Sequence, residues 1–170
     1  LAVLCTVTAF ADDSTVRIGG AVELAALGGK ELTGKIELTQ DIDMTGVTME
    51  PITSFTGEFN GNGYTIKNLT ISAELAENYI TKGAALFAAF SGTAHDVVFE
   101  NPSITLTKGQ NVGTAVLCGM VGDDGATIEN VGIVGGSVAS EATKTTYAGG
   151  LVGYAVNTSL TVKNCFTEAN

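Results

Sequence analysis

Two aspartates, Asp41 and Asp43, come closest to a catalytic pair in this 170-residue chain. One residue separates them, so in an extended strand both side chains would point to the same face. Paired carboxylates hydrolyse glycosidic bonds when about 5 Å or roughly 6.5–9.5 Å separates them. This pair, or Asp123 with Asp124, could also bind Ca²⁺, but each supplies too few oxygen ligands alone. The simpler interpretation of Asp41 and Asp43 is a solvated face that protects a sheet edge, and both interpretations remain open.

Other catalytic chemistry is limited by residue counts. His95 is the only histidine and Arg17 the only arginine. A single histidine excludes zinc sites built on a histidine pair and triads that need more than one histidine. His95 stands where Lys67, Glu129 and Lys163 stand in other repeats, so we expect it to face solvent. The sequence therefore predicts no catalytic residue, no metal site and no cofactor.

These side chains belong to a repeat. Four times an apolar residue is followed two places later by Asn or Asp, at Asn68, Asp96, Asn130 and Asn164; the first interval is shorter than the other two, which are equal. Such recurrence is typical of a solenoid. The apolar alternation slips by one place at the asparagines, which indicates a backbone bend in a conformation that Asn tolerates. We expect the four side chains to superpose as a ladder about 4.8 Å apart, with a different bond at Asp96.

Short strand-like segments make up each repeat. In the third repeat they are residues 114–121, 127–134 and 137–140, with a turn predicted at 122–125. A helical solenoid is excluded because Gly and Thr interrupt every candidate helix and the local period is two. We therefore predict an all-β solenoid over residues 35–170, with 35–44 as its first coil.

Residues 12–34 are predicted to form an N-terminal linker and a capping helix. Good helix formers occupy 21–27, and Val22, Leu24, Ala25 and Leu27 could form one apolar face. A short helix there would cover the open edge of the first coil, whose unpaired backbone groups would otherwise promote association.

Composition and charge bound the location and the partners. The chain has 22 glycines and only 15% charged residues, a composition that suits short strands joined by turns. Its net charge of −10 disfavours binding to nucleic acid and to anionic lipid surfaces. Residues 1–11 are predicted as the tail of a secretory signal peptide cleaved after Ala11, although a buried strand is the alternative. The mature chain would then act outside the cytoplasm without inserting into the membrane. A disulfide between Cys118 and Cys165 is possible.

Several segments resemble a known family. Residues 147–155 (YAGGLVGYA), followed by 161–165 (TVKNC), are similar to the GLUG motif of exported bacterial surface proteins. Residues 51–71 resemble the stretch that commonly precedes this motif. The resemblance implies a right-handed parallel β-helix in a secreted or surface-attached protein of gut- or host-associated bacteria. The motif is structural and transfers no catalytic residue. Some members are attached to IgA-cleaving metalloproteases, whose zinc motif this chain lacks.

Two functional hypotheses follow from the sequence. The first is a non-enzymatic solenoid module that serves as an adhesin, stalk or interaction scaffold, with a host protein or glycan as its extracellular ligand. The second is a module that binds or cleaves carbohydrate, or an accessory domain of a larger secreted enzyme. An aligned strip of exposed Tyr and Asp would favour the second hypothesis, and Thr-rich faces would favour the first.

Overall fold

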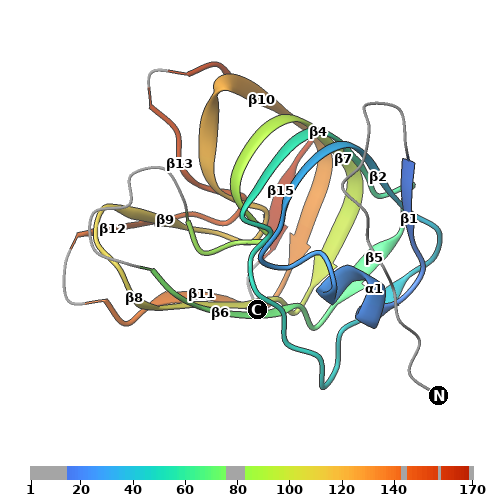
Figure 1. The fold of residues 1–170 in the computed structure, drawn as a ribbon, viewed down its shortest axis with the longest axis horizontal. Helices are drawn as coiled ribbons and strands as arrows, with labels where there is room; N and C mark the ends of the chain where they lie inside the picture. The colour runs from blue at the N-terminus through green and yellow to red at the C-terminus, as the bar shows by residue number, and fades with distance from the viewer. Residues whose placement is uncertain (1–14, 76–82, 143–144, 157, 169–170) are drawn as a thin grey trace.

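The computed structural model describes residues 15–75, 83–142, 145–156 and 158–168. Within these ranges the chain winds as a parallel β-solenoid (Figure 1), because each strand pairs in parallel with the equivalent strand of the next coil. The predicted fold class, an all-β parallel β-helix, is confirmed. The predicted signal-peptide tail lies outside the described residues, as does Tyr79, one of the four tyrosines that an exposed Tyr strip could include.

One large sheet forms the main wall of the stack. Its strands, in order along the stack, are β1 (Thr15–Ile18), β2 (Glu31–Leu38), β4 (Ser54–Asn60), β7 (Phe87–Glu100), β10 (Cys118–Val134) and β13 (Val152–Tyr154). The same sheet includes β3 (Ile42–Asp43), β5 (Thr65–Lys67), β14 (Leu160–Lys163) and β15 (Phe166–Glu168).

Two smaller sheets close the coils. One contains β6 (Thr70–Glu74), β8 (Ser103–Lys108) and β11 (Ser137–Ser140), which lie side by side below the large sheet in Figure 1. The other pairs β9 (Val112–Thr114) with β12 (Thr146–Ala148). Each full coil is therefore a long bent strand followed by two short ones.

The coils widen along the stack. In the narrow first coils, Thr15 pairs with Lys35 and Lys35 pairs with Glu58, so the chain returns to the large sheet after a short excursion. In the later coils, Glu58 pairs with Thr93 and Thr93 pairs with Thr127, which takes a markedly longer excursion. The stack is thus narrow at its N-terminal end and reaches full width at β7. The large sheet also begins before residue 35, where the sequence predicted the solenoid to start, because β1 and the first part of β2 already belong to it.

Inward side chains form apolar columns through the stack. One column contains Ile36, Phe59, Ala94 and Ile128, and all four are at most 1% exposed. Next to it, Phe55 and Phe87 stack with ring centroids 5.1 Å apart, and Phe87 stacks on Phe90 at 5.2 Å. Phe55 on β4 and Phe87 on β7 belong to neighbouring coils, so a single coil could not bury this surface alone.

A short helix, α1 (Ala21–Ala25), lies beside β1 at the N-terminal end of the stack (Figure 1). It buries Leu24 completely, and Leu27 in the following turn is 1% exposed. Val22, which the sequence placed on the same apolar face, is 76% exposed. Two residues correspond to more than half a helical turn, so Val22 and Leu24 cannot share a face in so short a helix.

The turn predicted at residues 122–125 is not a break between strands. These residues lie inside β10, where Val121 pairs with Phe90 and Ala126 pairs with Gly92. Four residues of β10 therefore stand opposite Ser91 alone. The extra residues form a bulge on the outer surface, which keeps the strand pairing on both sides of it.

Candidate functional site

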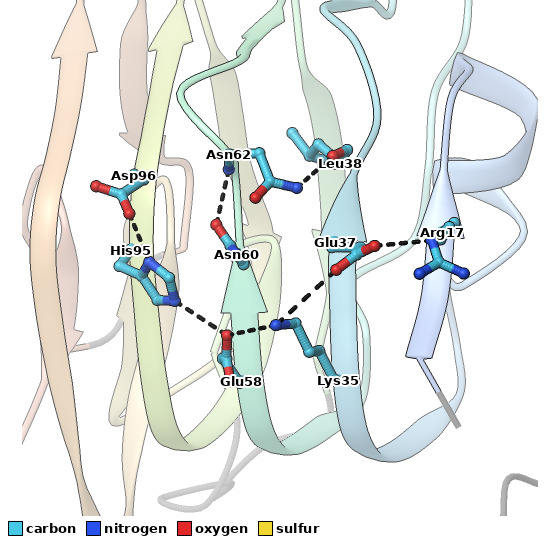
Figure 2. Close-up of polar contacts among 9 residues, drawn as sticks. All are labelled: Arg17, Lys35, Glu37, Leu38, Glu58, Asn60, Asn62, His95 and Asp96. Atoms are coloured by element: carbon cyan, nitrogen blue, oxygen red, sulfur yellow. Dashed lines mark hydrogen bonds and ion pairs between the residues drawn. The ribbon is translucent and has the colours of Figure 1, made fainter. Parts of the chain in front are cut away.

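A chain of polar contacts crosses the outer face of the large sheet (Figure 2). Arg17 Nε donates to Glu37 Oε1 at 2.8 Å, and Lys35 Nζ lies 3.0 Å from Glu58 Oε1. Glu58 Oε1 lies 3.2 Å from His95 Nε2. Because these residues stand at outward positions on β1, β2, β4 and β7, each contact joins one coil to the next. We call this set the charged network.

His95 lies between two carboxylates. Its Nδ1 is 2.8 Å from Asp96 Oδ2, while Nε2 faces Glu58. Partial burial lowers the pKa of His95, but the hydrogen bonds to Asp96 and Glu58 outweigh this and raise the pKa above its ordinary value. The imidazolium form is favoured because it donates at both nitrogens. His95 points outward, as expected, but Glu58 and Asp96 flank it and its side chain is only 22% exposed.

Three of the four predicted ladder residues occupy one column. Strand register places Asp96 beside Asn130, and Asn130 beside Asn164. Asn130 Nδ2 donates to Asp96 Oδ1 at 2.9 Å. Hydrogen bonds from His95 and Asn130 lower the pKa of Asp96. All three residues have positive φ, between 50° and 56°, so each occupies the left-handed region at a corner of the coil.

Asn68 belongs to a different column, which corrects the predicted ladder. Lys67 pairs with Glu100, so Asn68 lies beside Asn101, and both have positive φ. The shorter sequence separation between Asn68 and Asp96 is the signal that these two residues belong to different columns. Paired residues in the wide coils, such as Lys67 and Glu100, lie farther apart along the chain. By the same register, Lys67 is equivalent to Glu100 and not to His95.

The predicted acidic site is occupied by structural hydrogen bonds. Asp43 Oδ1 accepts from Thr45 Oγ1 at 2.7 Å and from Asn68 Nδ2 at 2.9 Å. These hydrogen bonds, of which the one from Thr45 has the largest effect, lower the pKa of Asp43 to about 2. Asp43 is therefore not suited to be a general acid. Asp41 Oδ1 accepts from the backbone N–H of Thr65 in the next coil at 2.9 Å. Both carboxylates therefore fasten one coil to another.

Next to the bulge of β10, which contributes part of its lining, the outer surface has a groove of about 420 Å³. Hydroxyl side chains, glycines and one carboxylate line it, and we call it the hydroxyl groove. Its residues are Thr56, Gly57, Ser91, Gly92, Thr93, Asp124, Gly125, Ala126, Thr127, Ser159 and Thr161. Asp124, from the bulge of β10, is exposed and is one of the lining residues.

Sequence reasoning missed this lining, although a signal was present. Thr93, Thr127 and Thr161 each stand three residues before an Asp or Asn of the ladder column. That repeat places the three hydroxyls in one column, which the strand register shows directly. The width of the bulge, in contrast, has no sequence signal that separates it from an ordinary turn.

The remaining candidate side chains have structural surroundings. Cys118 and Cys165 are both free thiols, and burial raises the pKa of Cys118 to about 12, so it is a poor nucleophile. Tyr147 and Tyr154 pack against each other with ring centroids 4.7 Å apart, and neither lines the hydroxyl groove.

Across 15–168, apart from the undescribed gaps, no three His, Cys, Asp or Glu side chains cluster closely enough to hold a metal ion. No helix in the described part of the chain has the length and apolar character needed to cross a lipid bilayer.

Comparison with known proteins adds one sequence relative and one structural neighbour. Over 112 residues, 66% of the chain, the sequence is 34% identical to halomucin of Haloquadratum walsbyi, of whose length this chain spans 1%. The fold is similar to a crystal structure from Bacteroides ovatus, provisionally described as an immunoglobulin A1 protease. The TM-score is 0.61 at 20% identity, covering 89% of this chain and 56% of that one, so the likeness concerns the fold alone. No family model matches the chain.

Proposed function

We propose that the chain is a non-enzymatic β-solenoid module of a secreted or cell-surface protein, serving as an adhesin, stalk or interaction scaffold. The observation that carries this proposal is the use made of its reactive side chains. Asp41, Asp43, His95 and Asp96 all bond from one coil to the next. Side chains held in this way stabilise a rigid stack instead of meeting a substrate.

The comparisons support the same proposal. Similarity to halomucin supports a location at or beyond the cell surface, and the segments at 147–155 and 161–165 support a repeat of the GLUG type. A parallel stack suits a scaffold because each coil adds length without changing the surface of the coils before it.

The non-enzymatic part of the proposal is tested with purified protein, neutral and acidic polysaccharides, and immunoglobulin A1. Reducing ends and peptide fragments are measured over a day against a heat-denatured control. We expect no product above that control. Release of reducing sugar that disappears in the Asp41→Asn variant would show that the acidic pair is catalytic after all.

The location is tested separately with an antibody against the folded domain. We expect it to label intact cells of the producing organism or their culture medium. Labelling only after the cells are permeabilised would contradict the proposed location.

A carbohydrate-binding role for the same scaffold is the second candidate. The hydroxyl groove favours it, because a Thr- and Ser-lined surface on a rigid stack offers hydrogen bonds without a nucleophile or an acid–base pair.

A further inference from the structure

The lining of the hydroxyl groove defines a class of ligand. Each Thr or Ser hydroxyl can donate one hydrogen bond and accept others, as the hydroxyls of a sugar do. Thr56 and Thr161 are exposed, and Thr93 and Thr127 are half-buried on the groove wall. Such a surface can exchange hydrogen bonds with a polyhydroxylated molecule without leaving its own groups unpaired.

The charges in and around the hydroxyl groove restrict the class of ligand further. The groove lining contains no Lys, Arg or His that could pair with a carboxylate, sulfate or phosphate, and Asp124 supplies a negative charge at its rim. The net charge of −10 also repels anionic polymers. Aromatic and long aliphatic side chains are absent from the lining as well, which disfavours an apolar ligand. A neutral glycan remains the best match.

The repeat favours a chain over a single sugar. Thr93, Thr127 and Thr161 stand in register on successive coils, so their hydroxyls recur at the strand spacing of about 4.8 Å. This interval is comparable to the length of one sugar residue in an extended glycan. A ligand lying along the stack could therefore repeat the same contact from coil to coil.

The floor of the groove is fixed by glycine. Gly57 and Gly92 have φ of 147° and 126°, and a Cβ on either would collide with the carbonyl oxygen of the glycine in the preceding coil. The backbone there cannot carry side chains that would fill the groove. The groove is consequently a preformed feature of the stack, which lowers the cost of ordering it on binding.

We propose that the hydroxyl groove binds a neutral glycan chain running along the solenoid axis across β7, β10 and β14. This inference rests on the proposed scaffold function and names the ligand class of that scaffold. Hydrogen bonds without aromatic stacking give weak binding at one groove, so the strength of attachment would come from many copies of the module.

The test is native gel electrophoresis through gels containing hydroxyethyl cellulose, a soluble mannan, polygalacturonate or serum albumin. At least one neutral glycan should retard the protein, and polygalacturonate and albumin should not. In the Thr93→Val, Thr127→Val double variant, which keeps side-chain shape and strand propensity, retardation should fall by about fivefold or more. Thr105→Val, a half-buried threonine on β8, serves as the matched control and should be retarded like the unmodified protein.

The proposal is overturned by any of four results. These are no retardation by either neutral glycan, equal retardation by polygalacturonate, retardation by albumin alone, or an unchanged double variant whose melting temperature matches that of the unmodified protein. None of these results involves product release, so failure of the groove is distinct from failure of the non-enzymatic scaffold.

Discussion

At the N-terminal end of the stack, α1 lies beside β1 and its Leu24 is fully buried (Figure 1), whereas at the C-terminal end β14 and β15 pair only with β10 among the described strands. Val162 on β14 and Phe166 on β15 are consequently 48% and 50% exposed. Val162 occupies the same column as Ile128, which is 0% exposed. Burial in this molecule is therefore decided by the presence of the next coil as much as by the residue itself.

The largest effect is expected from breaking the covered end. Leu24→Asp places an unpaired charge in a fully buried position and should lower the free energy of unfolding by about 4 kcal/mol or more. Val22→Asp, on the exposed side of the same helix, should change it by less than about 0.5 kcal/mol. Urea unfolding followed by circular dichroism measures both. Equal effects of the two variants would show that α1 does not cover the core.

A second pair of variants compares one column at two places. Ile128→Ala removes a side chain enclosed by coils on both sides and should cost about 2–5 kcal/mol. Val162→Ala, with a coil on one side, should cost less than about 1 kcal/mol. Urea unfolding followed by circular dichroism measures both variants. A large decrease in the free energy of unfolding for Val162→Ala would mean that another surface covers this position in solution.

The corner asparagines allow a finer comparison. Asn130→Ala loses the hydrogen bond to Asp96 and puts Ala in the left-handed region, so we expect a loss of about 1–3 kcal/mol. In Asn164→Ala the only expected cost is the strain of Ala in the left-handed region, which should lower the free energy of unfolding by about 1 kcal/mol. Asn130→Gly removes the strain and isolates the hydrogen bond. An unchanged midpoint for Asn130→Ala would show that its amide contributes nothing to the stack.

The smallest effect concerns the charged network together with Asp96, which lies 2.8 Å from His95. The raised pKa of His95 makes its contribution complete below the unfolded value of 6.5 and removes it as the pH rises through the folded pKa. Glu58 and Asp96 have lowered pKa values in the folded state. Their contributions to stability are therefore complete above their unfolded pKa values of 4.5 and 3.8, and are lost as the pH falls through the folded values.

Stability should therefore be greatest between about pH 4.5 and 6.5, where all three contributions are present. The alkaline decrease should be below about 1 kcal/mol, because the groups are partly in water. It should be absent in His95→Gln, measured by urea unfolding from pH 4 to 9. A decrease that persists in this variant would have to come from other groups.

The sequence predicts the solenoid well because its strongest signals are local and repeated. Apolar alternation and the equal intervals between Asp96, Asn130 and Asn164 place these three residues in successive wide coils. The narrow first coils were harder to align, because a change of coil length shifts the register. Because of that shift, sequence spacing assigns Asn68 to the wrong column and gives no link from Lys35 and Glu58 to His95.

The site was less predictable than the fold. Whether Asp41 and Asp43 face water or bond to the next coil depends on which residue the register places beside them, and those partners, Thr65 and Asn68, belong to another coil. The hydroxyl groove depends on the bulge at 122–125, because the bulge contributes Asp124 and Gly125 to its lining. Spacing alone contains neither piece of information.

The narrow N-terminal coils also bear on the order of folding. Because the short steps from Thr15 to Lys35 and from Lys35 to Glu58 come first in the chain, the smallest loops close during synthesis before the longer loops exist. Each newly made coil then meets a finished edge with its hydrogen-bonding groups already aligned. During synthesis, the coils that are already folded would provide the strand edge on which the next coil pairs. Strand pairing between residues far apart in the chain would then occur one coil at a time.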